Sequence, residues 1–177
     1  MIVLALVLGG KDRSTPTAPA VLPALTPTAP APNAAVLGPC TKVLEALPEQ
    51  LGTLLPRVVH PKPYSAFVVA WGDPAVILRC GVDRPADLKP GSTVDNILIG
   101  GSDGRTGVYF DVTSVEHNEV YTSVDRAVYI SITVPSKYAS PPVPTLAVAI
   151  AKALPAVCVG GQEPGLTDES KLCTRRP

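Results

Sequence analysis

Hydrophobic residues form a different pattern in each part of the chain, and the first ten residues are almost entirely apolar. They read MIVLALVLGG and are followed by the charged Lys11, Asp12 and Arg13. At ~1.5 Å per helical residue, such a run covers about half of a ~30 Å hydrocarbon core, which is too little for a spanning helix. Its length suits the hydrophobic region of a signal peptide, but no basic stretch comes before it. Residues 1–13 therefore predict the outer part of a truncated membrane anchor, with a minimal export signal as the alternative.

Residues 14–39 are rich in proline, threonine and alanine and follow no hydrophobic period. Proline fixes φ, lacks a backbone N–H and biases the residue before it towards extended structure, so this segment predicts neither a helix nor a central strand. We predict a polyproline-II spacer, which at ~3.1 Å per residue reaches up to roughly 80 Å. Such a stalk suits a cell-wall environment and could carry O-linked sugar. A disordered leader is the alternative.

Periodic patterns begin at Cys40. From residue 40 to 55 the apolar residues approximate one helical face, which Pro48 ends or kinks. Residues 127–134 alternate between apolar and polar side chains, which predicts a strand. Residues 72–74 (Gly-Asp-Pro) predict a hairpin turn, and residues 143–154 predict an amphipathic helix with proline in its first turn. Further strands are predicted at residues 66–71, 75–80, 94–99, 108–112 and 120–124.

The order of these elements, a helix, several strands and a helix, favours an α+β fold. We expect an antiparallel sheet with the N-terminal and C-terminal helices packed on one face. The connections between strands are too short for the helical crossovers that a parallel sheet requires. One globular domain is predicted over residues 40–158, followed by a polar, cysteine-containing tail over residues 159–177. A domain of this size buries roughly two-thirds of its unfolded surface, enough to fold alone.

Charge and motifs narrow the possible functions. The chain has 15 basic and 15 acidic residues and no Lys/Arg stripe, so nucleic acid is not an expected partner. Residues 100–107, GGSDGRTG, have the composition of a phosphate-binding loop but lack its Gly-Lys-Ser/Thr ending, and we expect a mobile hairpin loop. His60 and His117 lie in polar loops and are not expected to converge on a metal. The sequence therefore predicts no catalytic residue, no cofactor and no metal site.

Three segments together resemble a known family. They read CTKVLEALP from Cys40, WGDPAVILRCGVDRP from Trp71, and VYTSVDRAVYISITVP from Val120, and a short terminal helix follows. This combination resembles the domain-of-unknown-function family 3515, small exported proteins of actinobacteria that typically carry one N-terminal membrane anchor. The resemblance covers residues 40–154. It implies an extracytoplasmic location, anchored to the cell membrane by the N-terminus, and implies no chemistry.

Four cysteines in an exported chain favour disulfides over metal binding, and no CxxC or HxxxH spacing suggests zinc. Four cysteines permit three pairings. Cys40 and Cys80 both lie inside the resembling core, whereas Cys158 and Cys173 both lie in the C-terminal part. We therefore predict Cys40–Cys80 and Cys158–Cys173, worth ~4 and ~3 kcal/mol in the chain-entropy model.

Four residues are candidates for a binding site: Trp71, Arg84, Asp125 and Arg126. Asp125 could hold a turn while Arg126 anchors a carboxylate elsewhere, because neighbours on a strand point to opposite faces and do not pair automatically. In the functional interpretation, Arg84, Arg126 and Trp71 form an exposed recognition patch for a carboxylate-bearing or protein ligand, since Arg and Trp dominate interface energetics. In the structural interpretation, Trp71 is a core residue and the charged residues hold the fold.

We therefore expect a non-enzymatic accessory or binding module of the actinobacterial cell envelope. Its expected partner is a membrane-protein complex or a wall component. The alternative is a cell-wall-directed enzyme whose site is assembled from scattered Asp, Arg and Ser residues. A concave pocket with convergent polar groups and a perturbed carboxylate would favour that enzyme. A purely structural wall spacer would have neither a site nor a binding patch.

Overall fold

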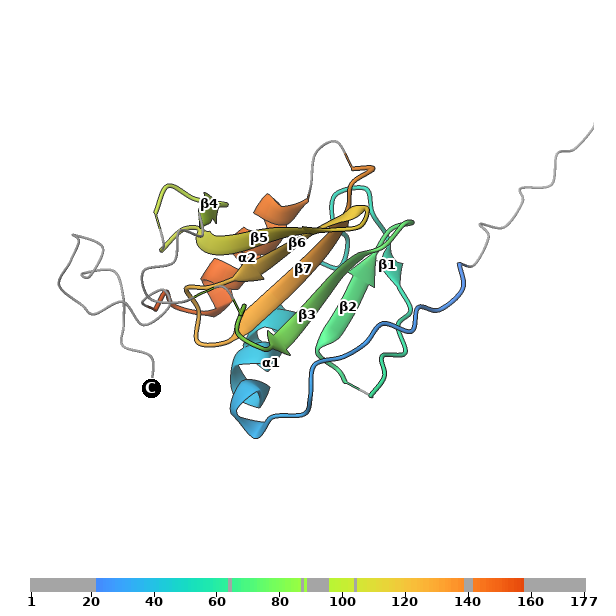
Figure 1. The fold of residues 1–177 in the computed structure, drawn as a ribbon, viewed down its shortest axis with the longest axis horizontal. Helices are drawn as coiled ribbons and strands as arrows, with labels where there is room; N and C mark the ends of the chain where they lie inside the picture. The colour runs from blue at the N-terminus through green and yellow to red at the C-terminus, as the bar shows by residue number, and fades with distance from the viewer. Residues whose placement is uncertain are drawn as a thin grey trace, which may run out of the picture.

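The computed structural model describes residues 22–63, 65–86, 88, 96–103, 105–138 and 142–157. Within them the chain forms a seven-stranded antiparallel sheet and two α-helices (Figure 1), which confirms the α+β class. The elements are, in chain order, η1 (Ala34–Val36), α1 (Leu37–Ala46), β1 (Pro56–Arg57), β2 (Val68–Trp71), β3 (Val76–Val82), β4 (Ile97–Ile99), β5 (Val108–Val115), β6 (Asn118–Ser123), β7 (Tyr129–Pro135) and α2 (Val143–Ala153).

The sheet consists of two meanders joined at its centre. The strand order is β1-β2-β3-β7-β6-β5-β4, so β7, the last strand in the chain, lies beside β3. Gly72 takes a φ of 75° in the turn between β2 and β3, where we predicted a hairpin. The predicted strands all have counterparts, and the two-residue β1 is an addition that no sequence period indicated.

The first helix is shorter than predicted and begins earlier. It starts at Leu37 and ends at Ala46, with Leu47 in an extended conformation. Pro48 explains this end, because proline disfavours the helical region for the residue before it. Pro39 falls in the first turn, where its missing N–H would have no helical partner in any case.

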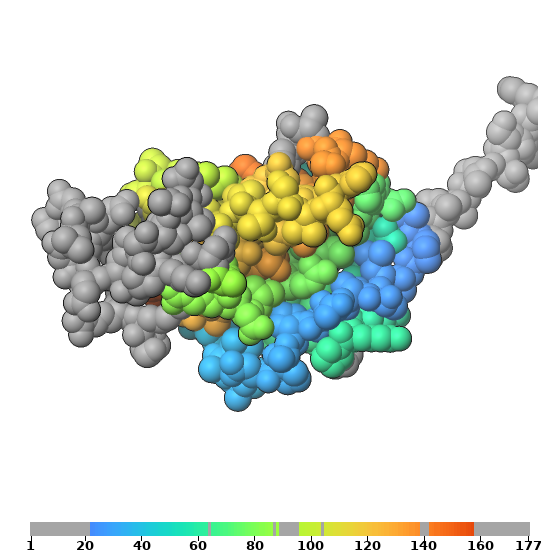
Figure 2. All heavy atoms as spheres, in the orientation of Figure 1, coloured from blue at the N-terminus to red at the C-terminus, as the bar shows by residue number. Residues whose placement is uncertain are grey.

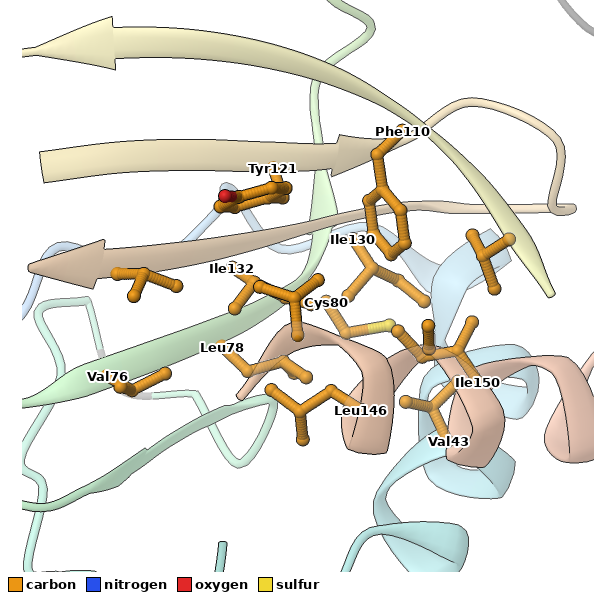
Figure 3. Packing of buried hydrophobic residues seen from close by; sticks show 14 of the residues in the cluster. Val43, Val76, Leu78, Cys80, Phe110, Tyr121, Ile130, Ile132, Leu146 and Ile150 are labelled. Atoms are coloured by element: carbon orange, nitrogen blue, oxygen red, sulfur yellow. The ribbon is translucent and has the colours of Figure 1, made fainter. Parts of the chain in front are cut away.

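One apolar cluster contains residues from both helices and from the central strands (Figure 3). In β7, the side chains of Ile130, Ile132 and Val134 are all buried, as the alternation predicts. They share the cluster with residues of α1, such as Val43, and of α2, such as Ile150. A buried Ile or Val side chain contributes about 1.5–3 kcal/mol through the hydrophobic effect.

A disulfide crosses this cluster. It joins Cys40 of α1 to Cys80 of β3 over a sequence separation of 40 residues, which confirms the first predicted pair. Both cysteines are buried. Cys158 and Cys173 lie outside the described residues, as do the predicted anchor and tail.

The described part of the predicted spacer lies against the domain. We call residues 22–33 the strap. Leu25 and Thr28 form parallel bridges with Val59 and Lys62, and the Nε of Arg79 donates to the Thr28 carbonyl oxygen at 2.9 Å. Figure 2 shows the strap, in blue, on the surface beside β3, in green. This part of the chain is therefore packed on the folded unit instead of extending away from it.

Candidate functional site

The predicted patch of Trp71, Arg84 and Arg126 does not form. Trp71 is 3% exposed and Arg126 is 0% exposed. The two lie at opposite ends of the sheet, since Trp71 pairs with Val76 at the start of β3 while Arg126 precedes Tyr129, which pairs with Val82 at its end. The indole Nε1 of Trp71 donates to the Glu49 carbonyl oxygen at 3.1 Å, which satisfies its polar atom inside the protein. Trp71 is a core residue.

Asp125 and Arg126 form a buried ion pair with each other. The Arg126 NH1 lies 2.6 Å from the Asp125 Oδ2, and its NH2 donates to the carbonyl oxygen of Gly107. The Asp125 carbonyl oxygen accepts the N–H of Val157, which follows α2. Strand alternation does not separate the two side chains, because they lie in the connection between β6 and β7. Hydrogen bonds of this pair thus link the β6–β7 connection to the start of β5 and to the end of α2.

Burial governs the titration of this pair. Desolvation raises the pKa of Asp125 to about 6, against the opposing effect of the Arg126 charge. Desolvation likewise lowers the pKa of Arg126, and the Asp125 carboxylate acts in the opposite direction. A perturbed carboxylate in a cleft would be a candidate catalytic group. Asp125 is only 2% exposed, so its carboxylate is not presented to a substrate in this conformation.

Two predicted binding residues border surface cavities: Trp71 lines one of about 400 Å³ from within the core, and Arg84 lines another. The Nε and NH2 of Arg84 donate to the carbonyl oxygen of Leu88, and its side chain is exposed. The cavity beside Arg84 has a volume of about 600 Å³ and is also lined by Asp83, Tyr129 and Asn33. Charged, amide and phenol groups therefore meet in one depression at the end of β3.

A mainly apolar cavity of about 450 Å³ adjoins the one beside Arg84. Phe67, Leu37 and Cys80 line it. Residues shared by the two cavities form the wall between them, namely Ala31, Pro32, Asn33, Ala34 and Val36. We call the two cavities together the corner groove.

Local sequence features fix the shape of this wall. The Asn33 side-chain oxygen accepts the N–H of Ala35 at 2.9 Å and caps the short helix η1, which is a common role for asparagine. Gly81 takes a φ of 87°, and a Cβ there would come within 3.0 Å of Val36. The pairing between β3 and β7 shifts register at this glycine. The bulge lets the corner approach the strand closely, as bulges with glycine often do.

The residues of this wall lie inside the predicted spacer, so no binding site was predicted there. The one available signal was Asn33 followed by an apolar run, which is the pattern of a helix start. The remaining lining comes from the start of α1, from the residues before β2, from the end of β3 and from the β6–β7 connection, which are far apart in the chain. No sequence period links such distant segments.

A comparison with protein families supplies the identity. The family model described as "Protein of unknown function (DUF3515)" matches residues 1–159. The chain belongs to the DUF3515 family. The match confirms the resemblance seen in the sequence and extends it over the apolar start and the strap of this DUF3515 protein. No curated protein and no solved structure matches the chain.

The glycine-rich loop of the DUF3515 protein does not cradle an anion in the described conformation. The Asp103 Oδ1 accepts the N–H groups of Arg105 and Thr106 at 2.9 and 3.0 Å. These bonds lower the pKa of Asp103. The N–H groups that a phosphate would need are thus bonded to a carboxylate of the same loop.

Two further findings concern the described residues of this DUF3515 protein. No three His, Cys, Asp or Glu side chains among them are grouped so as to hold a metal ion. No helix within them has the length and apolar character needed to cross a membrane.

Proposed function

We propose that the DUF3515 chain is a non-enzymatic binding module of the cell envelope that contacts a membrane-protein complex or a wall component through the corner groove. The observation that carries this proposal is the contact between an apolar cavity and a polar one that Arg84 borders. Binding sites commonly combine a mainly apolar wall with a few placed polar groups. A ligand with an apolar segment next to a carboxylate would match both halves of the groove.

An extracytoplasmic location with an N-terminal membrane tether is part of this proposal. The buried Cys40–Cys80 disulfide supports it, because structural disulfides persist in oxidising compartments and are rare in the cytosol. The apolar residues 1–10 fall inside the family match and would supply the tether. An actinobacterial source is proposed from the sequence resemblance alone.

We also infer that both helices cover the same face of the sheet and that the strap lies on the other. Residues of α1 and α2 share a cluster with Leu78 and Cys80. Arg79 lies between these two in β3, so its side chain points to the opposite face, where it bonds the strap. The corner groove takes its lining from the strap, from α1 and from β3, so it lies at the margin between these two faces.

The alternative function is a cell-wall-directed enzyme, and the raised pKa of Asp125 is the observation in its favour. A general acid must reach the proton acceptor on its substrate within hydrogen-bonding distance, directly or through one water. Asp125 is buried and paired with Arg126. Binding therefore accounts for the geometry better than catalysis does.

Co-purification from membranes tests the binding function. The tagged wild-type chain is compared with two charge reversals in the groove, Arg84→Glu and Asp83→Lys, and with Arg105→Glu as a control. Asp83 and Arg105 are exposed, so these changes should leave the fold intact, as circular dichroism can verify. We expect a specific partner to be lost from both groove variants and retained by the control. A partner retained by all three variants, or cleavage of wall-derived material by the wild-type chain, would contradict the proposal.

A further inference from the structure

A second surface, separate from the corner groove, lies where the strap runs along the β1 edge of the sheet. Exposure alternates along residues 57–62: Val58, His60 and Lys62 are exposed, while the residues between them are at least partly buried. Side chains two apart in an extended segment point the same way. An apolar, an aromatic and a cationic side chain therefore share one side of this edge.

A second large apolar side chain lies at the start of the strap. Val58 is 61% exposed, and the first described residue, Leu22, is 41% exposed. The start of the strap is held at this edge, because the NH2 of Arg57 donates to the Pro23 carbonyl oxygen at 2.8 Å. The Leu25 N–H also donates to the Val58 carbonyl oxygen at 2.9 Å. We call Leu22, Val58, His60 and Lys62 the strap edge.

Acidic residues are absent from the two segments that build the strap edge. No Asp or Glu occurs at positions 13–44 or 50–72. Asp73, the next acidic residue, interacts with Arg57, at 3.5 Å between NH1 and Oδ1. Lys62 thus has no carboxylate in its own segment and forms no ion pair with the residues that the structure describes, so the surface combines exposed apolar groups with a lysine. Peripheral proteins use this combination to bind anionic membrane surfaces.

The length of the chain between the apolar run and Leu22 limits how far the strap edge can lie from a membrane that holds the apolar run. Residues 11–21 are the only connection between the apolar run and the strap. However they are arranged, they span at most ~40 Å at ~3.6 Å per residue. A domain of this size has a radius of gyration of about 14 Å, so its diameter is comparable to that reach. Because the strap is packed on the domain, a tethered domain stays next to the membrane, with the strap edge at the point of attachment.

We propose that the strap edge docks on the headgroup surface of an anionic lipid membrane. The proposal rests on the membrane tether proposed above and adds a defined orientation to it. Leu22 and Val58 insert at the boundary between headgroups and acyl chains, and Lys62 contacts lipid phosphate. The corner groove is a separate surface and remains available to a partner.

Lysine footprinting on the full-length chain tests this orientation. The chain is reconstituted into vesicles of phosphatidylglycerol and phosphatidylcholine, recovered by flotation and treated with a membrane-impermeant amine-acylating reagent. Lys152 serves as the internal reference because it is exposed on α2, which contacts β4 and β5 at the other edge of the sheet. We expect acylation of Lys62 relative to Lys152 to fall about tenfold on the vesicles compared with detergent, equivalent to ~1.4 kcal/mol of docking.

Two variants with matched exposure complete the test. Val58→Glu should restore Lys62 acylation, whereas Val148→Glu, at a position 50% exposed on α2, should not. If the chain floats with vesicles and Lys62 reacts as in detergent, the docking proposal is wrong and the tether stands. If the chain does not float, both are wrong. Equal protection on phosphatidylcholine alone would overturn the requirement for anionic lipid.

Discussion

At the scale of single residues, the side chains most typical of interfaces are used inside this protein. Trp71 and Arg126 belong to residue types that often dominate binding energies, yet both are buried. A buried guanidinium is tolerated only with partners, since an unpaired buried charge is very costly. Arg126 finds them in Asp125 and the Gly107 carbonyl. Residue type alone therefore did not separate a binding role from a structural one. Arg84 differs from these two residues because it is exposed, beside the corner groove.

The buried pair predicts a pH dependence of stability. The pKa of Asp125 is raised from 3.8 to about 6 in the folded protein, chiefly by burial. The folded state then binds more protons than the unfolded state between these values, so this group's contribution to the free energy of unfolding falls as pH rises from about 4 to about 6. The loss amounts to roughly 3 kcal/mol at ~1.4 kcal/mol per pKa unit.

Carboxyl ¹³C shifts measured against pH check this prediction directly. Asp125 should titrate near pH 6, and Asp103 should titrate below its usual range because of its hydrogen bonds to Thr106 and Arg105. A midpoint for Asp125 below 3.8 would show that its interactions outweigh desolvation and would reverse the expected slope.

At the scale of secondary-structure elements, the sequence predicted what depends on periodic burial. In β7, Ile130, Ile132 and Val134 face the core, and a strand with one buried face must alternate. The C-terminal helix was predicted for the same reason. Its observed bounds, Val143–Ala153, differ by one residue from those predicted. Burial of one face leaves a period in the sequence, and that period can be read without a structure.

Neither the packed strap nor β1 was predicted, because their contacts produce no periodic pattern of apolar residues in the sequence. The strap is held by backbone bonds, for example from the Ala29 N–H to the Lys62 carbonyl oxygen, and by the Arg79 side chain. Prolines still offer carbonyl acceptors, as Pro23 does for Arg57. A proline-rich segment can therefore pack along a sheet edge while its composition predicts a free spacer.

The bulge in β3 gives a prediction at this scale. Gly81→Ala places a side chain at a φ of 87° and within 3.0 Å of Val36, and strain of this kind costs about 1–3 kcal/mol. Gly38→Ala is the matched control, because nothing lies within 4 Å of the added Cβ and alanine is favoured in a helix by up to ~1 kcal/mol. Urea unfolding should show a lower midpoint for Gly81→Ala and an equal or higher one for Gly38→Ala. Equal midpoints for Gly81→Ala and the wild type would show that the corner relaxes freely.

At the scale of the whole molecule, several stabilising features lie at the end of the sheet that carries the corner groove. The disulfide ends at Cys80, the bulge follows at Gly81, and the buried ion pair immediately precedes Ala127, which lines the groove. Binding sites are most precise when they are built on elements fixed by their surroundings. The strap edge, in contrast, lies along the β1 margin of the sheet, away from these contacts. The two surfaces would let one small domain contact a membrane and a partner at the same time.

The disulfide should therefore contribute to both stability and binding. Replacing Cys40 and Cys80 together with serine removes a cross-link between residues 40 apart, which is expected to lower the free energy of unfolding by ~4 kcal/mol in the chain-entropy model. Because α1 and β3 would then be joined only by packing, the corner groove should loosen before the sheet does. Hydrogen exchange should show lost protection at the Leu47 N–H, which bonds the Val43 and Leu44 carbonyl oxygens at the end of α1, while the pairing of β5 with β6 stays protected. Disulfide mapping by mass spectrometry would first establish the Cys40–Cys80 bond and test the predicted Cys158–Cys173 pair. Recovery of free thiols at Cys40 and Cys80 from the native protein would contradict both this prediction and the proposed location.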